Sequence, residues 1–227
     1  MKEEYEKLAQ AAYENSQELA DEAELLMKSG GYPRACSLAV LATEEFAKSF
    51  LCRCYSMGII TDPNFRRDLA DHDIKSIHFL RIIIAYLLYS RHKREIDDAF
   101  QVDSIPRNHD ILKNTLDRIA EEEKRNIQNA VNVFAQADLI KQSGFYTDID
   151  RKRVVKPREI ITKQRAQTVL SYLPVIRALG SILQLDEKGF HNMVEMLDYE
   201  VTFGTIRPSV RPRKRREEYY DALLSNE

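Results

Sequence analysis

The sequence contains few residues that interrupt helices, and it contains no tryptophan. Only 7 of its 227 residues are Gly and 7 are Pro. Alternating strand patterns and internal repeats are also missing. Because residues with high helix propensity make up much of the remainder, we predict long helices and an all-α fold.

Cysteine is scarce, and no long apolar segment occurs. Cys36, Cys52 and Cys54 form no C-x-x-C pair, which favours reduced thiols in an intracellular protein. The longest apolar run, residues 82–89, is far shorter than the roughly 20 residues that cross a bilayer. The charged N-terminus indicates a helix rather than a signal peptide. We therefore expect a cytoplasmic protein that does not enter the membrane.

Common signatures of cofactor and metal chemistry are absent as well. The sequence has no P-loop, no glycine-rich dinucleotide turn, no H-E-x-x-H and no G-x-S-x-G. His78, His92, His109 and His191 lack the spacing of metal ligands. We therefore expect no cofactor and no metal.

The composition is that of a packed domain, with 44% apolar and 31% charged residues. Apolar residues recur at steps of three and four, which predicts amphipathic helices. We expect these helices at residues 2–28, 32–57, 64 or 68–100, 110–142, 158–183, 187–202 and 215–224. The prediction is an α-helical bundle over residues 1–185, with residues 186–227 as a helical extension.

Two connections are expected within this bundle. Gly30 and Gly31 end the first helix, and the small residues that follow predict a closely packed antiparallel helix pair. Residues 101–109 are expected to form a loop, and residues 145–157 an extended polar segment.

A charged cluster, Glu44-Glu45-x-x-Lys48, lies in the second expected helix. Lys48 is four residues from Glu44 and three from Glu45, so it can pair with either carboxylate. One interpretation is an exposed ion pair worth about 0.3–0.5 kcal/mol, and spacing alone favours it. The other is that Glu45 falls on the apolar stripe, where a partly desolvated carboxylate needs a partner.

A second polar segment begins the third expected helix. His72 and Lys75 are three residues apart and share a helix face, while Arg66 and Arg67 precede them. Beside a cation that holds a phosphate, a histidine can act as an acid or base on RNA. The alternative, which the residue types alone favour, is a polar helix start capped by aspartates.

Two further segments carry polar or basic residues. Tyr146 and Asp148 follow the fourth expected helix and can complete a polar site, or Phe145 and Tyr146 simply fix the loop to the bundle. The basic run near the C-terminus is either a solvated tail or a contact with RNA or the ribosome. It contains Arg213, Lys214, Arg215 and Arg216.

Three of these segments together resemble the AbiV-type abortive-infection family, a HEPN-like helical group of bacteria. They are the small-residue helix that ends in E-E-x-x-K at Lys48, the H-x-x-K of His72 and Lys75, and the G-x-Y-x-D of Gly144, Tyr146 and Asp148. Each motif is short, but their order and spacing are specific together. The resemblance covers about residues 5–185.

The resemblance implies an antiphage protein that arrests growth of the infected cell by blocking translation. Many HEPN proteins are homodimers and metal-independent ribonucleases with an R-x(4–6)-H motif. On this sequence, the resemblance makes His72 the acid or base, while Arg66 or Arg67 holds the scissile phosphate and Lys75 stabilises charge.

A supporting polar network would then contain Glu44, Glu45, Lys48, Tyr146 and Asp148. RNA or the translation machinery would be the partner, with a phage protein as activator. The alternative function is a non-catalytic protein that blocks translation by binding a phage or ribosomal partner. A purely structural bundle is a third possibility that the sequence leaves open.

Overall fold

The computed structural model describes residues 2–58, 69, 72–103, 109–134, 136–150 and 153–183. Its helices are α1 (Lys2–Lys28), α2 (Tyr32–Ser56), α4 (His72–Asp103), α5 (His109–Glu122), α6 (Lys124–Phe134), α7 (Ala137–Phe145), α8 (Pro157–Ile160), α9 (Lys163–Leu170) and α10 (Leu173–Leu183). The strands are β1 (Asp148–Asp150) and β2 (Arg153–Val155). The all-α class is confirmed. The predicted extension, residues 186–227, lies outside the described residues.

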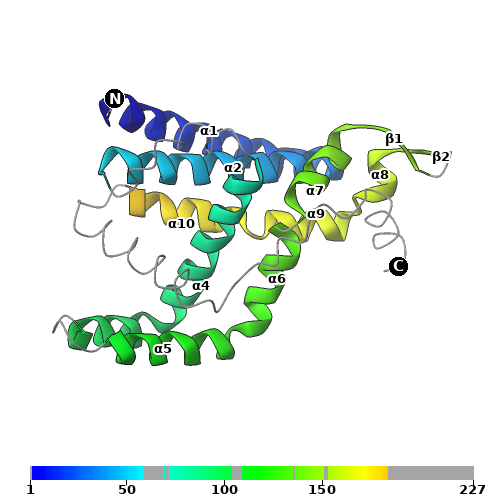
Figure 1. Cartoon of the computed structure of the whole chain (residues 1–227). Coiled ribbons are helices and arrows are strands. Elements are labelled where there is room, and N and C mark those ends of the chain that lie inside the picture. Colours follow the sequence, from blue (N-terminus) through cyan, green and yellow to red (C-terminus); the bar gives the residue numbers. More distant parts are fainter. Residues whose placement is uncertain are drawn as a thin grey trace.

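The long helices α1 and α2 form the predicted antiparallel pair (Figure 1). Gly30, at φ +80°, adopts the left-handed conformation that glycine reaches without steric cost, and it ends α1. Ser49 donates a hydrogen bond of 2.6 Å to the backbone carbonyl of Ala9. Small buried residues let the two helices approach closely: Ala9, Ala12, Ala20 and Ala23 on α1, and Ala35, Ala39 and Ala42 on α2.

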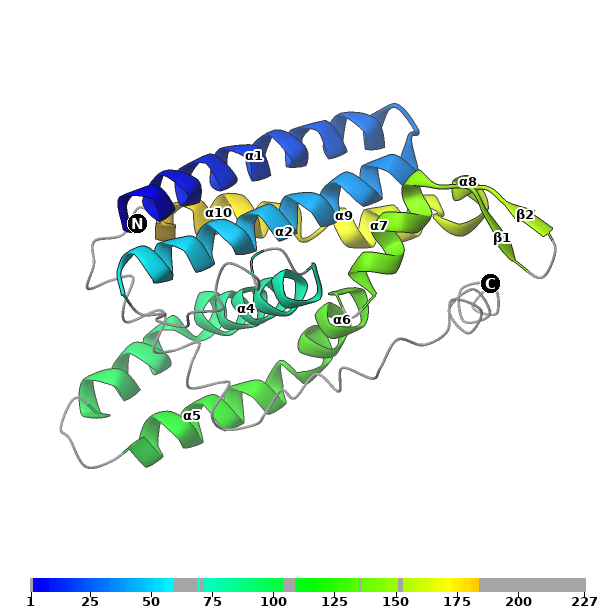
Figure 2. The same cartoon turned by 45° about the horizontal axis from the view of Figure 1, so that its top comes forward.

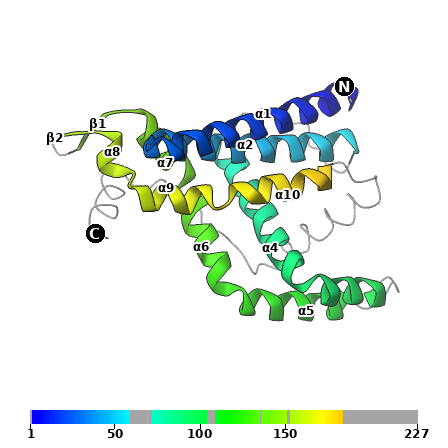
Figure 3. The same ribbon diagram turned by 180° about the vertical axis from the view of Figure 1, so that it is seen from behind.

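The central helix of the bundle is α2, which contacts α1, α4, α7, α8, α9 and α10. Helix α1 runs along one side of it, and α9 and α10 follow each other along another (Figures 2 and 3). Helix α4 leaves this layer and leads to α5, and α6 returns towards α7 (Figure 1). Because so many elements cover it, α2 can bury side chains on several faces.

Aromatic side chains form a continuous chain through the core. Ring centroids lie 6.3 Å apart for Tyr13 and Phe46, 6.0 Å for Phe46 and Phe79, and 5.1 Å for Phe79 and Phe134. Tyr172 extends the chain, 5.1 Å from Phe134. All four pairs meet edge to face, the arrangement that the ring quadrupoles favour. The chain joins α1, α2, α4, α6 and the turn before α10.

The single helix expected at residues 110–142 is wrong, because α5, α6 and α7 cover this stretch. The chain turns at Glu123, whose carboxylate accepts a hydrogen bond of 2.6 Å from Arg91 of α4. One straight helix cannot lie beside the far end of α4 and also return to α2. Helix α7 continues past the expected end at residue 142, through Ser143 and Gly144 to Phe145.

Three other features were not predicted. Helix α4 is kinked at His92, where φ is −120° and ψ is 23°. The helix expected at residues 158–183 is divided into α8, α9 and α10, with Thr162 capping α9 by accepting from the Arg165 N–H. The polar segment at residues 145–157 contains an antiparallel hairpin, in which Asp148 pairs with Val155.

The three cysteines are buried and form no disulfide. Burial raises the pKa of Cys36 to about 12 and that of Cys52 to about 11, so these thiols stay protonated at neutral pH. They therefore behave as small core residues. Among the described helices, none combines the length and apolar character that a membrane crossing requires.

Gly144 lies at the closest approach of α7 to α2, because a Cβ there would collide with the Ser37 hydroxyl and the Pro33 carbonyl. We expect Gly144→Ala to displace α7 and lower the free energy of unfolding by about 2 kcal/mol, measured by urea denaturation. Gly31→Ala is the comparison, since its Cβ would come no closer than 3.2 Å to the neighbouring Leu26. An equal loss in both variants would contradict the backbone collision.

Candidate functional site

Five charged side chains from three helices form a cluster, called here the Glu–Lys cluster. Its members are Glu44, Glu45 and Lys48 from α2, Lys75 from α4 and Lys141 from α7. The three helices are separated in sequence but all pack together around α2. The cluster thus exists only in the folded protein.

The most buried part of the cluster is an ion pair between Glu44 and Lys141. The Lys141 Nζ lies 2.8 Å from the Glu44 Oε1, and the two side chains are 11% and 2% exposed. Lys141 also lies 3.3 Å from Asp138, and its backbone carbonyl accepts a hydrogen bond of 2.8 Å from Ser37. Glu45, the carboxylate expected to be partly desolvated, is partly buried as well, with a side chain that is 18% exposed, but Glu44 lies deeper. Glu44 occupies the buried position because α7 covers it.

Glu45 forms the second ion pair, with Lys48 on the same helix. The Lys48 Nζ lies 2.8 Å and 3.0 Å from the two carboxylate oxygens of Glu45. Asn15 of α1 donates to the same carboxylate at 3.2 Å. Both charged side chains remain partly exposed. The local pairing predicted from spacing is thus found at three residues of separation.

Lys75 is the third lysine, and its side chain is buried with 6% of the residue exposed. Burial lowers the pKa of Lys75 below the ordinary lysine value; Glu44 and Glu45 oppose this effect, and Lys48 and Lys141 add to it. Among the described residues its ammonium has no hydrogen bond and no ion pair. Since the two carboxylates already hold Lys141 and Lys48, Lys75 is available to an anion such as a phosphate.

Of the other predicted catalytic residues, the structure describes only the backbone of His72. His72 is the first residue of α4, one helical turn before Lys75, and its side chain lies outside the described part of the structure. Arg66 and Arg67 also lie outside the described residues, as do Arg213, Lys214, Arg215 and Arg216. The predicted meeting of an arginine with His72 therefore stays a prediction.

The Tyr146 side chain, in the loop after α7, points into solvent and is not part of the buried cluster. This side chain is 65% exposed, and its ring contacts that of Phe145, which is exposed too. Tyr146 is therefore too exposed to fix the loop to the bundle, while for Phe145 this role stays a prediction. Asp148 lies in β1, and its side chain is outside the described part.

Lys141 is the site residue that sequence reasoning missed. It belongs to the segment that ends in G-x-Y-x-D, and it faces α2 three residues before Gly144. Spacing along the sequence can indicate a partner for these carboxylates only within α2 itself. A buried carboxylate needs a cation, and the lysine of the third motif was the available signal.

The charges of the Glu–Lys cluster, three ammonium groups and two carboxylates, disfavour a metal ion. Lys141 and Lys48 occupy the two carboxylates, and the neighbouring Lys75 would repel a cation. Across the residues that the structure describes, no group of three or more His, Cys, Asp or Glu side chains could hold a metal ion.

The fold and the cluster define a class: a helical bundle with a polar site formed by three sequence motifs, on α2, α4 and α7. The model of the HEPN family AbiV matches residues 4–175, which is most of the chain. The chain therefore belongs to the AbiV family, and the resemblance seen in the sequence is confirmed. No curated protein and no solved structure matches it.

Removing the Glu44 carboxylate should deprive the buried Lys141 ammonium of its nearer carboxylate and leave Asp138 at 3.3 Å. We expect Glu44→Gln to lower the free energy of unfolding by about 3 kcal/mol. Glu45→Gln, at the partly exposed pair, should cost about 1 kcal/mol. Urea denaturation of both variants and of Glu44→Gln with Lys141→Met measures the difference. The double variant should recover stability, and its failure to do so would remove the ion pair as the cause.

Lys75 should reduce stability, because its charge is buried and pairs with no carboxylate in the part of the chain that the structure describes. We expect Lys75→Met to raise the free energy of unfolding by about 1 kcal/mol at neutral pH. Since the pKa of Lys75 is lowered in the folded state, the gain should shrink as the pH rises through that pKa towards the ordinary lysine value. Thermal unfolding at pH 7 and pH 10 tests this. Lys93→Met, at an exposed lysine on α4, is the control and should show no such gain.

Proposed function

We propose that this chain is an antiphage abortive-infection protein that acts as a metal-independent ribonuclease and thereby arrests translation. Membership of the AbiV family supports the role in defence. The observation that carries the proposed chemistry is Lys75, one turn after His72, a buried ammonium that forms no ion pair with the residues that the structure describes. A cation of this kind beside a histidine suits cleavage of a phosphodiester.

In the proposed reaction the ribose 2′-hydroxyl attacks the adjacent phosphorus. The bond from the 2′-oxygen to phosphorus forms, the bond to the 5′-oxygen breaks, and a 2′,3′-cyclic phosphate and a 5′-hydroxyl result. His72 takes the proton of the 2′-hydroxyl or delivers one to the leaving 5′-oxygen, and a water molecule makes the other of these two proton transfers. Arg66 or Arg67 holds the phosphate, and Lys75 stabilises the negative charge that develops on it. No metal is required, because these side chains supply the positive charge.

The remaining members of the Glu–Lys cluster would act as positioning residues. Glu44 and Glu45 favour the charged form of Lys75, and this opposes the effect of burial on its pKa. The pairing of Glu44 with Lys141 also ties α7 to α2, next to α4. Their role is to keep Lys75 charged and in place, as a preorganised site requires.

We further propose that the protein works in the cytoplasm as a homodimer, with RNA or the translation machinery as its partner and a phage protein as its activator. HEPN domains commonly dimerise, which supports the proposed homodimer. In such a dimer, the second chain can contribute side chains to the site of the first.

The ribonuclease proposal is tested by incubating the purified full-length protein with total RNA, with and without a divalent-metal chelator. We expect cleavage in both conditions, with products that end in a cyclic phosphate. His72→Ala and Lys75→Met should each reduce the rate at least about 100-fold and keep the helical circular-dichroism spectrum. Lys93→Met is the matched control for Lys75→Met and should cleave at the normal rate. Loss of cleavage with the chelator would contradict metal-independent chemistry.

A non-catalytic protein that binds a phage or ribosomal partner is the second candidate function. The exposed apolar residues Phe145, Tyr146 and Val154, close together in sequence at the hairpin, favour it. In that case neither the wild type nor the variants would cleave RNA. Polar substitutions at Phe145 and Tyr146 would then abolish growth arrest in infected cells.

A further inference from the structure

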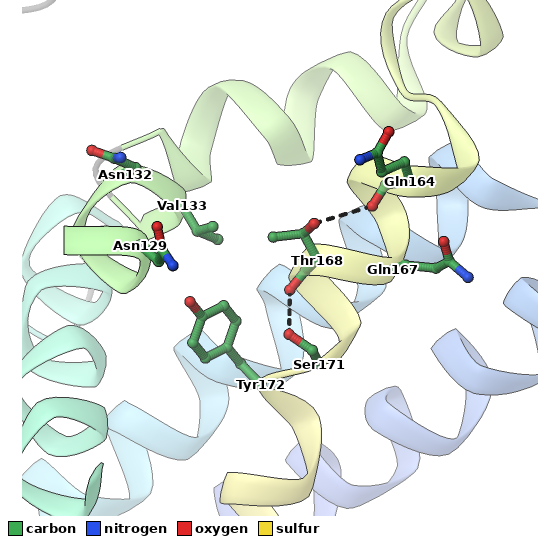
Figure 4. Close-up of a pocket in the computed structure, with 8 residues that line it drawn as sticks. All are labelled: Asn129, Asn132, Val133, Gln164, Gln167, Thr168, Ser171 and Tyr172. Carbon is green, nitrogen blue, oxygen red and sulfur yellow. Dashed lines mark hydrogen bonds between the residues drawn. The ribbon is translucent and has the colours of Figure 1, made fainter. Parts of the chain in front are cut away.

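A groove with a volume of about 640 Å³ lies between α6 and α9. Its walls carry four carboxamide side chains, those of Asn129 and Asn132 from α6 and of Gln164 and Gln167 from α9 (Figure 4). Tyr172 lies between the two helices, with its hydroxyl on the side of Asn129 (Figure 4). Tyr172 lies in the turn before α10, and the four carboxamides belong to helices that contribute nothing to the Glu–Lys cluster.

The lining of the groove points to a neutral, planar ligand with polar edges. No charged side chain lines it. A carboxamide presents a hydrogen-bond donor and an acceptor side by side, which matches the paired groups on the edge of a nucleobase. Within the described part of the chain, the side-chain amides of Asn129, Gln164 and Gln167 form no hydrogen bond. Three carboxamides are thus available to a ligand.

Tyr172 supplies the aromatic surface that such a ligand needs. The ring is half-buried and held edge to face against Phe134, so its orientation is fixed by the core. Burial raises the pKa of the Tyr172 hydroxyl, which therefore remains a hydrogen-bond donor at neutral pH. Tyrosine rings at the surface stack bases of every kind.

Cations flank the neutral lining on both helices. Arg125 lies one turn before Asn129 on α6, and Lys163 lies one turn before Gln167 on α9. Both side chains are exposed. An uncharged sugar would not use these cations, whereas the phosphates on either side of a bound base would.

We propose that the groove between α6 and α9 binds an unpaired nucleobase of single-stranded RNA. The choice of RNA as the nucleic acid rests on the proposed function; the recognition of a base rests on the groove. The groove is then a substrate-recognition subsite. The groove is connected to the proposed catalytic region by contacts in the core. Tyr172 packs on Phe134, and Phe134 packs on Phe79. Phe79 lies one turn after Lys75 on α4.

The test measures binding of the full-length protein to a fluorescent 2′-O-methyl oligoribonucleotide by anisotropy. This probe cannot be cleaved through its 2′-oxygen, so binding is read without any catalytic variant. Gln164→Ala with Gln167→Ala removes two exposed side chains and should raise the dissociation constant at least about tenfold. Gln10→Ala, at an exposed carboxamide on α1, is the matched control and should bind like the wild type.

Two further probes separate recognition of the base from attraction of the phosphates. An abasic strand and a fully paired duplex should bind weakly, and neither should respond to the groove substitutions. Equal affinity of the wild type and the groove variant for the single strand would overturn the inference, as would equal affinity for the abasic strand. Binding through the groove without any cleavage would instead refute the ribonuclease proposal and leave the base site standing.

Discussion

The ion pair between Glu44 and Lys141 is the interaction on which the rest of the site depends. Charges are costly to bury, and these two are buried at a distance of 2.8 Å, so each requires the other. The pair fixes α7 against α2, where Gly144 and Ser37 allow and secure the close approach. With α7 in place, the carboxylate of Glu44 is occupied, and Lys75 of α4 faces the cluster as an additional cation.

Lys75, the additional cation, lowers the stability of the fold but can serve the proposed function. A packed core would be more stable with an apolar side chain at position 75, because burial disfavours the charged form of Lys75. A buried ammonium without an ion pair is, however, what an anionic ligand needs, since the ligand then replaces no internal partner. The neighbouring carboxylates limit the cost by favouring the charged form. This compromise is typical of functional sites, where part of the stability is given up for a preorganised charge.

The aromatic chain from Tyr13 to Tyr172 gives the bundle a rigid core that reaches both polar regions. It passes through Phe79, next to the cluster, and ends at Tyr172, in the groove between α6 and α9. Edge-to-face packing of these rings links the core beside the groove to the core beside the cluster. An extended polymer can be held at two such places at once, and this suits a nucleic-acid strand better than a small molecule.

The sequence by itself determined the all-α class, the antiparallel pair of α1 and α2 and the pairing of Lys48 with Glu45. These features follow from local propensities, from Gly30 and from spacing within one helix. The sequence could not show that residues 110–142 form three helices or that Glu44, rather than Glu45, is the buried carboxylate. Tertiary structure decided these points, because helix directions and buried partners depend on contacts between distant segments. Lys141 meets Glu44 only when α7 packs on α2, and the pattern of residues along the chain does not indicate that contact.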